Sequence, residues 1–179
     1  MERWIGTDPF APGRQQPGVQ VDTIAIRPAT AADVPSIVAL VNRLARRGQL
    51  LPRTTRSVYE TLGDWLVAVG PEAGDEILGC VSLLRYTSGL VEVRSLAVQE
   101  AAQGRGIGSH LMQALIAEAK RRHISTLFAL TRAVPFFRRF GFAVTERERF
   151  PEKVWHDCQQ CPLLHNCDET AMILEIMPK

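Results

Sequence analysis

The sequence predicts an α/β fold of the α+β kind, with a mixed, mostly antiparallel sheet flanked by helices. Short runs of β-branched and aliphatic residues alternate along the chain with apolar stripes at helical spacing. Two of these runs, 65–69 and 77–84, are joined by a turn-rich segment at 70–75, which is typical of antiparallel strands. Another run, 90–98, leads through a glycine-rich turn into a helix.

Length and composition indicate one globular domain. The chain has 179 residues, of which 46% are hydrophobic, and its formal net charge is +2. The arginines are spread along the chain, which favours solvated faces over a nucleic-acid surface. We expect a disordered tail over 1–20, where Pro and Gly recur without periodicity, and a single domain over 21–179.

The cellular setting is predicted from what the sequence lacks. No apolar run approaches the roughly 18 residues of a membrane span, and the N-terminus has no apolar signal-peptide core. We therefore expect a cytoplasmic protein with no membrane or nucleic-acid partner. Its four cysteines are then expected to be thiols or metal ligands rather than disulfides.

The first part of the chain reads as a strand at 23–27 followed by a helix over 31–45. Apolar residues recur along this helix at spacings of three and four, and Gly48 is expected to stop it. A second, short helix is predicted over 57–62, ahead of the two antiparallel strands.

The second part begins with the strand 90–98 and a helix whose apolar stripe runs from Gly108 to Ala119. A buried strand is predicted at 126–130, followed by a short helix that ends in Phe140-Gly141-Phe142 and turns into another strand. A last strand is predicted at 171–176.

The segment Gln103-Gly104-Arg105-Gly106-Ile107-Gly108 has a physical use. The first turn of a helix leaves backbone N–H groups unpaired and carries the positive end of the helix dipole. Glycines remove the side chains that would keep a phosphate away and permit positive φ, while Arg105 or Gln103 can add donors. The segment therefore predicts an anion site.

Two other phosphate-binding patterns fit less well. The nucleotide-triphosphate P-loop needs a Lys-Ser/Thr pair after the last glycine, where this chain has Ser109-His110. The dinucleotide fingerprint needs an acidic residue about twenty positions on, where this chain has 124–126 without a carboxylate.

A strand ending Leu-Ala-Val followed by Gln-Gly-Arg-Gly-Ile-Gly resembles the acetyl-CoA motif of the GNAT N-acetyltransferases. The stretch IRPATAADVPSIVALVN from Ile26 and the Phe-Gly-Phe turn resemble the same family. The resemblance implies the GNAT fold, an acyltransferase and acetyl-CoA as cosubstrate. The residues that it implies for coenzyme binding are Leu96, Ala97, Val98, Gln103, Gly104, Arg105, Gly106, Ile107, Gly108 and Ser109.

Acetyl transfer to an amine needs a neutral amine, a polarised thioester carbonyl and a proton for the departing thiolate. Glu92 is the best candidate for the base, because a carboxylate in an otherwise apolar strand must be functional, paired or solvent-facing. Alternation puts Glu92, Arg94 and Leu96 on one face, so a neighbour interaction of Glu92 with Arg94 is the competing interpretation. The family resemblance implies that backbone N–H groups around 96–98 polarise the carbonyl.

The general acid is harder to assign. Many GNAT enzymes carry a tyrosine four residues before the glycine of the Gly-Phe turn, and this chain has Phe137 there. Thr131, Ser95 or water would then have to supply the proton. We take Thr131 as the candidate for the general acid.

A narrower resemblance covers about residues 23–177. The segments LLPR from Leu50, EVRSLAV from Glu92, LTR from Leu130, and 153–169 are similar to the short, stand-alone N-acetylglutamate synthases of bacterial arginine synthesis. It implies L-glutamate as acceptor, with arginines holding its carboxylates. The matching positions are Arg53, Arg94, Arg56 and Arg132. The kinase domain of the longer synthases does not precede these residues, which puts feedback control by arginine in doubt.

The cysteine-rich loop over 153–169 is a candidate metal site. Cys158, Cys161 and Cys167 with His165 offer three thiolates and one imidazole, and a Cys-x-x-Cys turn lets two thiolates approach one zinc ion. The competing interpretation is a thiol-rich loop packed over the active site. A redox pair of Cys158 with Cys161 is less favoured, because nothing places it at a helix start.

Two other functions stay open at this point. One is a GNAT enzyme acting on another amine, such as a protein N-terminus, a polyamine or a drug. The other is a non-catalytic module that senses CoA or a metal through its cysteine loop. A homodimer is the expected assembly, since dimers are common among soluble oligomers.

Overall fold

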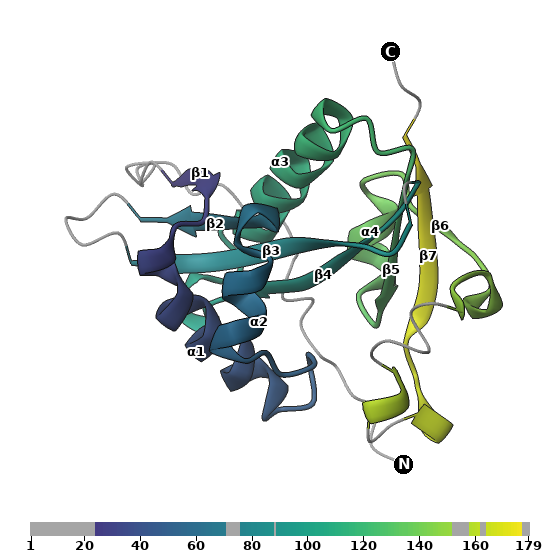
Figure 1. Cartoon of the computed structure of the whole chain (residues 1–179), viewed down its shortest axis with the longest axis horizontal. Helices are drawn as coiled ribbons and strands as arrows, with labels where there is room; N and C mark the ends of the chain where they lie inside the picture. Colours follow the sequence, from purple (N-terminus) through teal and green to yellow (C-terminus); the bar gives the residue numbers. More distant parts are fainter. Residues whose placement is uncertain (1–23, 71–75, 88, 152–157, 162–163, 177–179) are drawn as a thin grey trace.

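The computed structural model describes residues 24–70, 76–87, 89–151, 158–161 and 164–176. A seven-stranded sheet forms the centre of the molecule, in the order β1-β2-β3-β4-β5-β7-β6 (Figure 1). Every neighbouring pair is antiparallel except β4 with β5, which confirms the mixed, mostly antiparallel sheet. Its strands are β1 (Ala25–Pro28), β2 (Trp65–Val69), β3 (Ile77–Arg85), β4 (Leu90–Val98), β5 (Thr126–Thr131), β6 (Ala143–Val144) and β7 (Thr170–Glu175).

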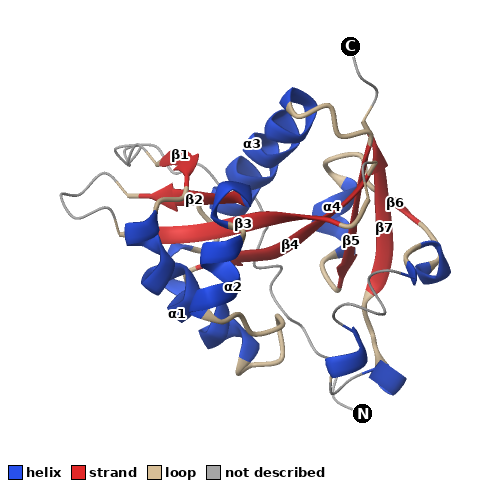
Figure 2. Ribbon diagram, in the orientation of Figure 1, coloured by secondary structure: helices blue, strands red, loops and turns tan. Residues whose placement is uncertain are grey.

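Helices cover the sheet on both sides (Figure 2). Side chains along β2 alternate between two cores, because successive residues of a strand point to opposite faces. Val67 packs with the helices of one face, and its neighbours Leu66 and Ala68 pack with those of the other. The helices are α1 (Val34–Ala45) and α2 (Thr55–Glu60) on the first face, and α3 (Ile107–Arg121) and α4 (Val134–Arg138) on the second.

The predicted apolar stripe of α3 is confirmed. Leu111, Met112, Leu115 and Ala119 are fully buried against the sheet. Gly106 begins the helix in the left-handed conformation, with φ of +80°, which glycine adopts at little cost. The strand, glycine turn and helix predicted for this stretch are therefore present as one continuous unit.

The alternation of β4 breaks at one point. Cys80 of β3 pairs with Ala97, but Ser82 pairs with Arg94, so two residues of β4 lie opposite one residue of β3. Such a β-bulge bends the strand and re-aims its side chains. Ser95 adopts a φ of +54° there, and Leu96 packs in the α3 core, on the face opposite Glu92. The prediction that Glu92, Arg94 and Leu96 share one face is therefore wrong for Leu96.

β4 and β5 pair only at their first residues. The parallel register runs from Leu90 with Thr126 to Glu92 with Phe128 and ends there. Beyond this point β4 pairs with β3 and β5 pairs with β7, and Figure 1 shows the two strands running in different directions. The sheet thus divides after Glu92. Among the described residues, no strand pairs with the β5-facing edge of β4 beyond this point.

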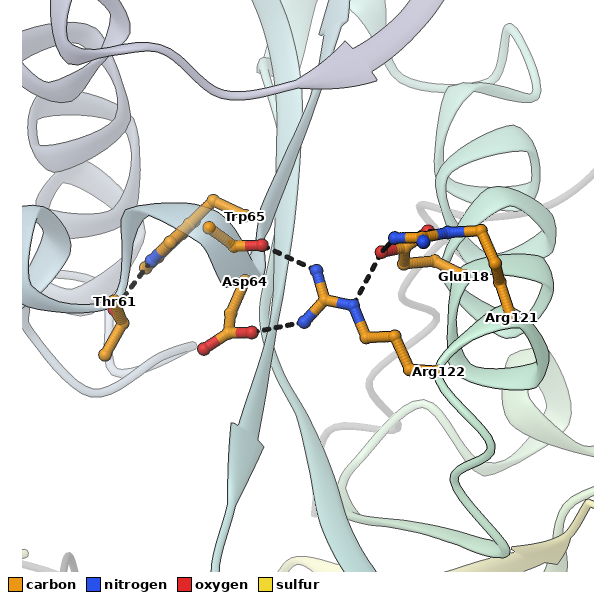
Figure 3. A network of polar contacts seen from close by, with 7 residues as sticks. Thr61, Asp64, Trp65, Glu118, Arg121 and Arg122 are labelled. Carbon is orange, nitrogen blue, oxygen red and sulfur yellow. Dashed lines mark hydrogen bonds and ion pairs between the residues drawn. The ribbon is translucent and has the colours of Figure 1, made fainter.

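A polar network at the C-terminal end of α3 connects the two helical layers (Figure 3). Arg122 donates from Nε to Glu118 at 2.6 Å, from Nη2 to the carbonyl of Gly63 at 2.6 Å, and from Nη1 to Asp64. Hydrogen bonds from Arg121 and Arg122 lower the pKa of Glu118 to about 2. Asp64 ends the short 3₁₀ turn η2 (Leu62–Asp64) on the side of α2, so Arg122 holds α3 to the start of β2.

Element boundaries differ from the predictions by a few residues. The second helix begins at Thr55, because Thr54 caps it by accepting a hydrogen bond from the N–H of Ser57 at 3.0 Å. Short 3₁₀ turns also appear that the periodicity does not predict, at η1 (Ala31–Asp33), η3 (Glu100–Ala102), η4 (Arg147–Arg149), η5 (Cys158–Gln160) and η6 (Leu164–Asn166). The predicted tail at 1–20 lies outside the described residues. Among those that are described, no helix is long and apolar enough to cross a membrane.

Candidate active site

The glycine turn between β4 and α3 presents backbone rather than side chains. Gly104 and Gly106 have φ of +76° and +80°, and a side chain at either would meet no atom within 4 Å. The left-handed Gly106 provides no side-chain cap, so the first N–H groups of α3 have no acceptor from one. A helix of 15 residues adds the positive end of its dipole at the same point. The turn can therefore hold an anion.

The other residues predicted for coenzyme binding surround this turn. Ala97 and Val98 are buried on opposite faces of β4, so they contribute backbone to any ligand at the strand edge. Gln103 donates from Nε2 to the carbonyl of Val98 at 3.3 Å, which fixes the turn to the strand end. Ile107 is 1% exposed and its side chain belongs to the core.

Glu92 lies where β4 and β5 separate. Its residue is 3% exposed, and it is the last of β4 to pair with β5. Tyr86, at the end of the β3–β4 hairpin, donates from its hydroxyl to Glu92 Oε2 at 2.9 Å. A buried carboxylate with a hydrogen-bond donor beside it, at the opening of the sheet, has the position that a proton acceptor needs.

Arg53 approaches the same strand from the α1–α2 connection. Its Nε donates to Ser95 Oγ at 3.3 Å, so a guanidinium reaches the bulge of β4 at the residue that follows Arg94. Arg94 itself lies two residues from Glu92 on the same strand, and its Nε and Nη1 atoms are buried. The structure thus brings Arg53, which lies 42 residues before Ser95 in the sequence, to the strand that also carries Arg94 and Glu92.

The α1–α2 connection is held by Asn42. Its Oδ1 accepts a hydrogen bond from the N–H of Arg53, and its Nδ2 donates to the carbonyl of Arg53, both at 2.9 Å. The sequence predictions missed this residue and also Tyr86. A polar residue between Val41 and Leu44 in an otherwise apolar helix stripe was the available signal for Asn42.

The bulge itself rests on side chains of β3. Ser82 Oγ donates to the carbonyl of Arg94 at 3.3 Å, and Cys80 Sγ donates to that of Ser95 at 3.8 Å. Burial raises the pKa of the Cys80 thiol to about 12, so this cysteine is a structural group of the core, as its apolar strand predicts.

Two of the predicted carboxylate-binding arginines have other partners. Arg56 has a side chain that is 87% exposed and pairs with Glu60 one helical turn away. Arg132 donates from Nε to Asp168 at 2.7 Å and from Nη1 to the carbonyl of Gly48 at 2.9 Å. Arg132 thereby joins the end of the cysteine segment to the end of α1, and its hydrogen bond lowers the pKa of Asp168.

Thr131 ends β5 on the far side of the opening. Its hydroxyl oxygen accepts a hydrogen bond from the N–H of Ala133 at 2.9 Å, and the residue is 9% exposed. A hydroxyl that accepts one hydrogen bond still has its proton to donate. Thr131 therefore remains able to serve as a proton donor, as does Ser95.

The predicted zinc set is not assembled. Cys158, Cys161, His165 and Cys167 all fall within the described residues, and among those no three His, Cys, Asp or Glu side chains come together as metal ligands. Cys167 Sγ lies 3.9 Å from Glu169 Oε2 instead. Residues 153–157 of the predicted loop lie outside the described part of the chain.

Comparisons with known proteins agree with this fold. Residues 43–142 match the acetyltransferase (GNAT) family. An uncharacterized N-acetyltransferase of Chlorobaculum tepidum is 35% identical over 83% of this chain and 94% of its own length. An amino-acid acetyltransferase of Mycobacterium tuberculosis is 34% identical over 68% of this chain and 69% of its own length.

A solved structure has the same fold. The N-acetylglutamate synthase of Neisseria gonorrhoeae, in complex with coenzyme A and N-acetyl-glutamate, superposes with a TM-score of 0.74 at 26% identity. The match covers 86% of this chain and 35% of that longer protein.

Proposed function

Because the chain belongs to the acetyltransferase (GNAT) family, we propose that this acyltransferase moves an acetyl group from acetyl-CoA to the α-amine of L-glutamate. The observation that carries the choice of acceptor is the placement of Arg53 and Arg94 at the bulge of β4, on the strand that also carries Glu92. Two guanidiniums suit a substrate with two carboxylates, since each can bind one carboxylate through paired hydrogen bonds.

The coenzyme takes the glycine turn and the edge of β4. Its pyrophosphate lies at the N-terminus of α3, where bare amides and the helix dipole favour negative charge. The pantetheine arm, which has amide groups of its own, runs along the β4 edge that β5 leaves after Glu92. Backbone N–H groups near Leu96 then meet the thioester oxygen and stabilise the charge that develops on it.

Transfer proceeds by direct attack in a ternary complex. The α-ammonium of glutamate loses a proton to the Glu92 carboxylate, and the neutral nitrogen forms a bond to the thioester carbon. The C–S bond breaks, and the thiolate leaves as CoA-SH after taking a proton from Thr131, Ser95 or water. The nitrogen, now bonded to the acetyl carbon, loses its second proton, which restores that donor, and Glu92 releases the proton it took to solvent. The products are N-acetyl-glutamate and CoA. This reaction is the first step of arginine synthesis from glutamate.

Two comparisons support glutamate over other amines. The relative in M. tuberculosis is named an amino-acid acetyltransferase, and the solved N. gonorrhoeae enzyme holds N-acetyl-glutamate together with CoA. The name of the C. tepidum relative does not state which acceptor it uses. An acceptor without a carboxylate would leave Arg53 and Arg94 with no role in binding it.

A thiol-release assay tests the proposal. Purified protein receives acetyl-CoA with L-glutamate, L-glutamine, L-aspartate, glycine or spermidine, and free CoA is measured over time against a sample without acceptor. We expect the highest kcat/KM with L-glutamate. Release of CoA that depends on spermidine but on none of the amino acids would overturn the choice of acceptor, and no acceptor-dependent release with any amine would overturn the activity itself.

A further inference from the structure

Glu92 is held by a side chain from outside its own strand. Tyr86 follows β3 at the tip of the hairpin, and its hydroxyl donates to Glu92 Oε2 at 2.9 Å. The register pairs Leu84 with Glu92, so the phenol reaches back over the strand pair to the carboxylate. This contact does not come from an adjacent position in the sequence, and it fixes one carboxylate oxygen at a defined place.

The ring of Tyr86 is itself fixed. It packs against Phe128 with the ring centroids 5.7 Å apart, and Phe128 stacks on Phe150 at 4.2 Å. Phe128 and Phe150 are at most 1% exposed, and Phe128 pairs with Glu92 across the β4–β5 ladder. Paired residues point to the same face of a sheet, so the aromatic stack lies beside the carboxylate that Tyr86 contacts.

The backbone of Tyr86 is also held, because its N–H donates to the carbonyl of Leu90 at 3.1 Å. The Tyr86 side chain is therefore fixed at both ends, at its backbone and at its hydroxyl. A hydrogen bond to one oxygen of a carboxylate selects one rotamer of that carboxylate and so fixes the direction of its second oxygen.

We infer that Tyr86 is the positioning residue of the general base: it orients Glu92 so that the carboxylate faces the acceptor amine. This inference rests on the proposed role of Glu92 and deepens it. Tyr86 does not replace the family tyrosine whose place Phe137 takes, because it contacts the base rather than the leaving thiolate.

The Tyr86→Phe variant tests the inference, since it keeps the stacked ring and removes only the hydroxyl. We expect kcat to fall about 10-fold, the value of one hydrogen bond to a charged group, while KM for both substrates stays within about twofold of the wild type. The chain has two tyrosines, and Tyr59→Phe is the matched control. Tyr59 is 49% exposed on α2 and its hydroxyl donates to the carbonyl of Ala31 at 3.4 Å, so its variant should keep the wild-type kcat.

A double variant separates positioning from a general structural effect. Glu92→Gln should lower kcat by about 100-fold, and adding Tyr86→Phe to it should lower kcat no further, because the residue acts through the carboxylate. A Tyr86→Phe variant with wild-type kcat, or losses that multiply in the double variant, would overturn the inference while leaving the proposed function intact. Wild-type turnover by Glu92→Gln would instead remove the base, and the inference with it.

Discussion

The side chain of Asn42 binds both polar groups of the Arg53 backbone, accepting from its N–H and donating to its carbonyl at 2.9 Å each. This pair of hydrogen bonds fixes the segment between α1 and α2 at Arg53, whose side chain reaches Ser95. The position of the Arg53 guanidinium therefore depends on an amide eleven residues earlier, on α1. Recognition of the acceptor is expected to depend on that amide as well.

The Asn42→Ala variant should weaken acceptor binding without changing the coenzyme site. Loss of two partly buried hydrogen bonds frees the segment, and we expect the L-glutamate KM to rise about 10-fold at an unchanged acetyl-CoA KM. Initial rates with each substrate varied in turn measure both constants. Arg43→Ala, at the exposed neighbouring position, is the control and should keep both. An Asn42→Ala enzyme with the wild-type glutamate KM would contradict the role of Arg53.

Arg53→Ala should raise the glutamate KM by about 10- to 100-fold, because hydrogen bonds to charged groups are each worth about 1.5–3 kcal/mol. Arg53→Lys keeps the charge but loses the planar fork, so we expect it to recover only part of the affinity. The same initial-rate measurements apply. Full recovery by lysine would show that charge alone matters, and an unchanged KM in Arg53→Ala would remove the residue from the acceptor site.

Gly106→Ala should raise the acetyl-CoA KM, because it places a side chain and a strained φ of +80° at the anion site. We expect a rise of about 10-fold, together with a loss of about 1–2 kcal/mol in the free energy of unfolding. Gly48→Ala is the matched control, since Gly48 has a φ of +70° and equally open surroundings. Urea titrations measure the stability of both variants, and initial rates measure their acetyl-CoA KM. Equal acetyl-CoA KM values for the two variants would argue against phosphate binding at Gly106.

Gly79→Ala should destabilise the fold where β3 passes beneath α3. A Cβ there would lie 2.8 Å from the carbonyl oxygen of Ala97 and 3.0 Å from Leu111 Cδ1. Over-packing of this kind costs about 1–3 kcal/mol in the free energy of unfolding, which urea titration measures. Gly63→Ala, where the added carbon meets no atom within 4 Å, should stay close to the wild type. A Gly79→Ala protein as stable as wild type would mean that α3 can move away without cost.

Asp33 makes the fold sensitive to acid. Its carboxylate accepts hydrogen bonds from Arg27 at 2.7 and 3.0 Å and from Thr30, and these lower its pKa from 3.8 to about 2. A depressed pKa in the folded state stabilises the protein above the unfolded value, and this stabilisation is lost as the pH falls from about 4 to about 2. Asp33 is 6% exposed, so its full contribution is about 2 kcal/mol.

Urea titrations of wild type and Asp33→Asn at pH 6, 4 and 3 test this expectation. The difference in unfolding free energy should be largest at pH 6 and should shrink between pH 4 and pH 3. Glu60→Gln removes an exposed carboxylate as a control and should change stability by only a few tenths of a kcal/mol. A difference for Asp33→Asn that does not vary with pH would contradict the depressed pKa.

The fold was predictable from the sequence where its signals are local. The stripe from Leu111 to Ala119 and the glycines before it define α3 and its N-terminus without reference to any other part of the chain. The bulge at Ser95 was not predictable in this way, because it depends on the register of β4 against β3 and on contacts from Cys80 and Arg53. Period-two alternation therefore assigned Leu96 to the wrong face.

The residues of the candidate site were likewise predictable only where the signal was local. Glu92 stood out as a carboxylate in an apolar strand, and the structure places it where β4 and β5 part. Tyr86 was missed because its contact with Glu92 depends on the register of β3 against β4, which the sequence pattern does not specify. Arg132 matched the resemblance, but its partner Asp168 comes 36 residues later. The Cys-x-x-Cys spacing predicted a shared metal ion, but within the described residues no three such side chains come together as ligands.

The bond between Asn42 and Arg53 has a consequence for how such an enzyme can change its substrate over evolution. In the proposed enzyme, the coenzyme site consists mainly of main chain and glycine, which few replacements can alter without damage. The proposed acceptor side includes Arg53, on a short connection that α1 anchors from one position. We therefore expect that exchanging residues between 49 and 54 can accommodate new amines while the acetyl-donor site is inherited unchanged.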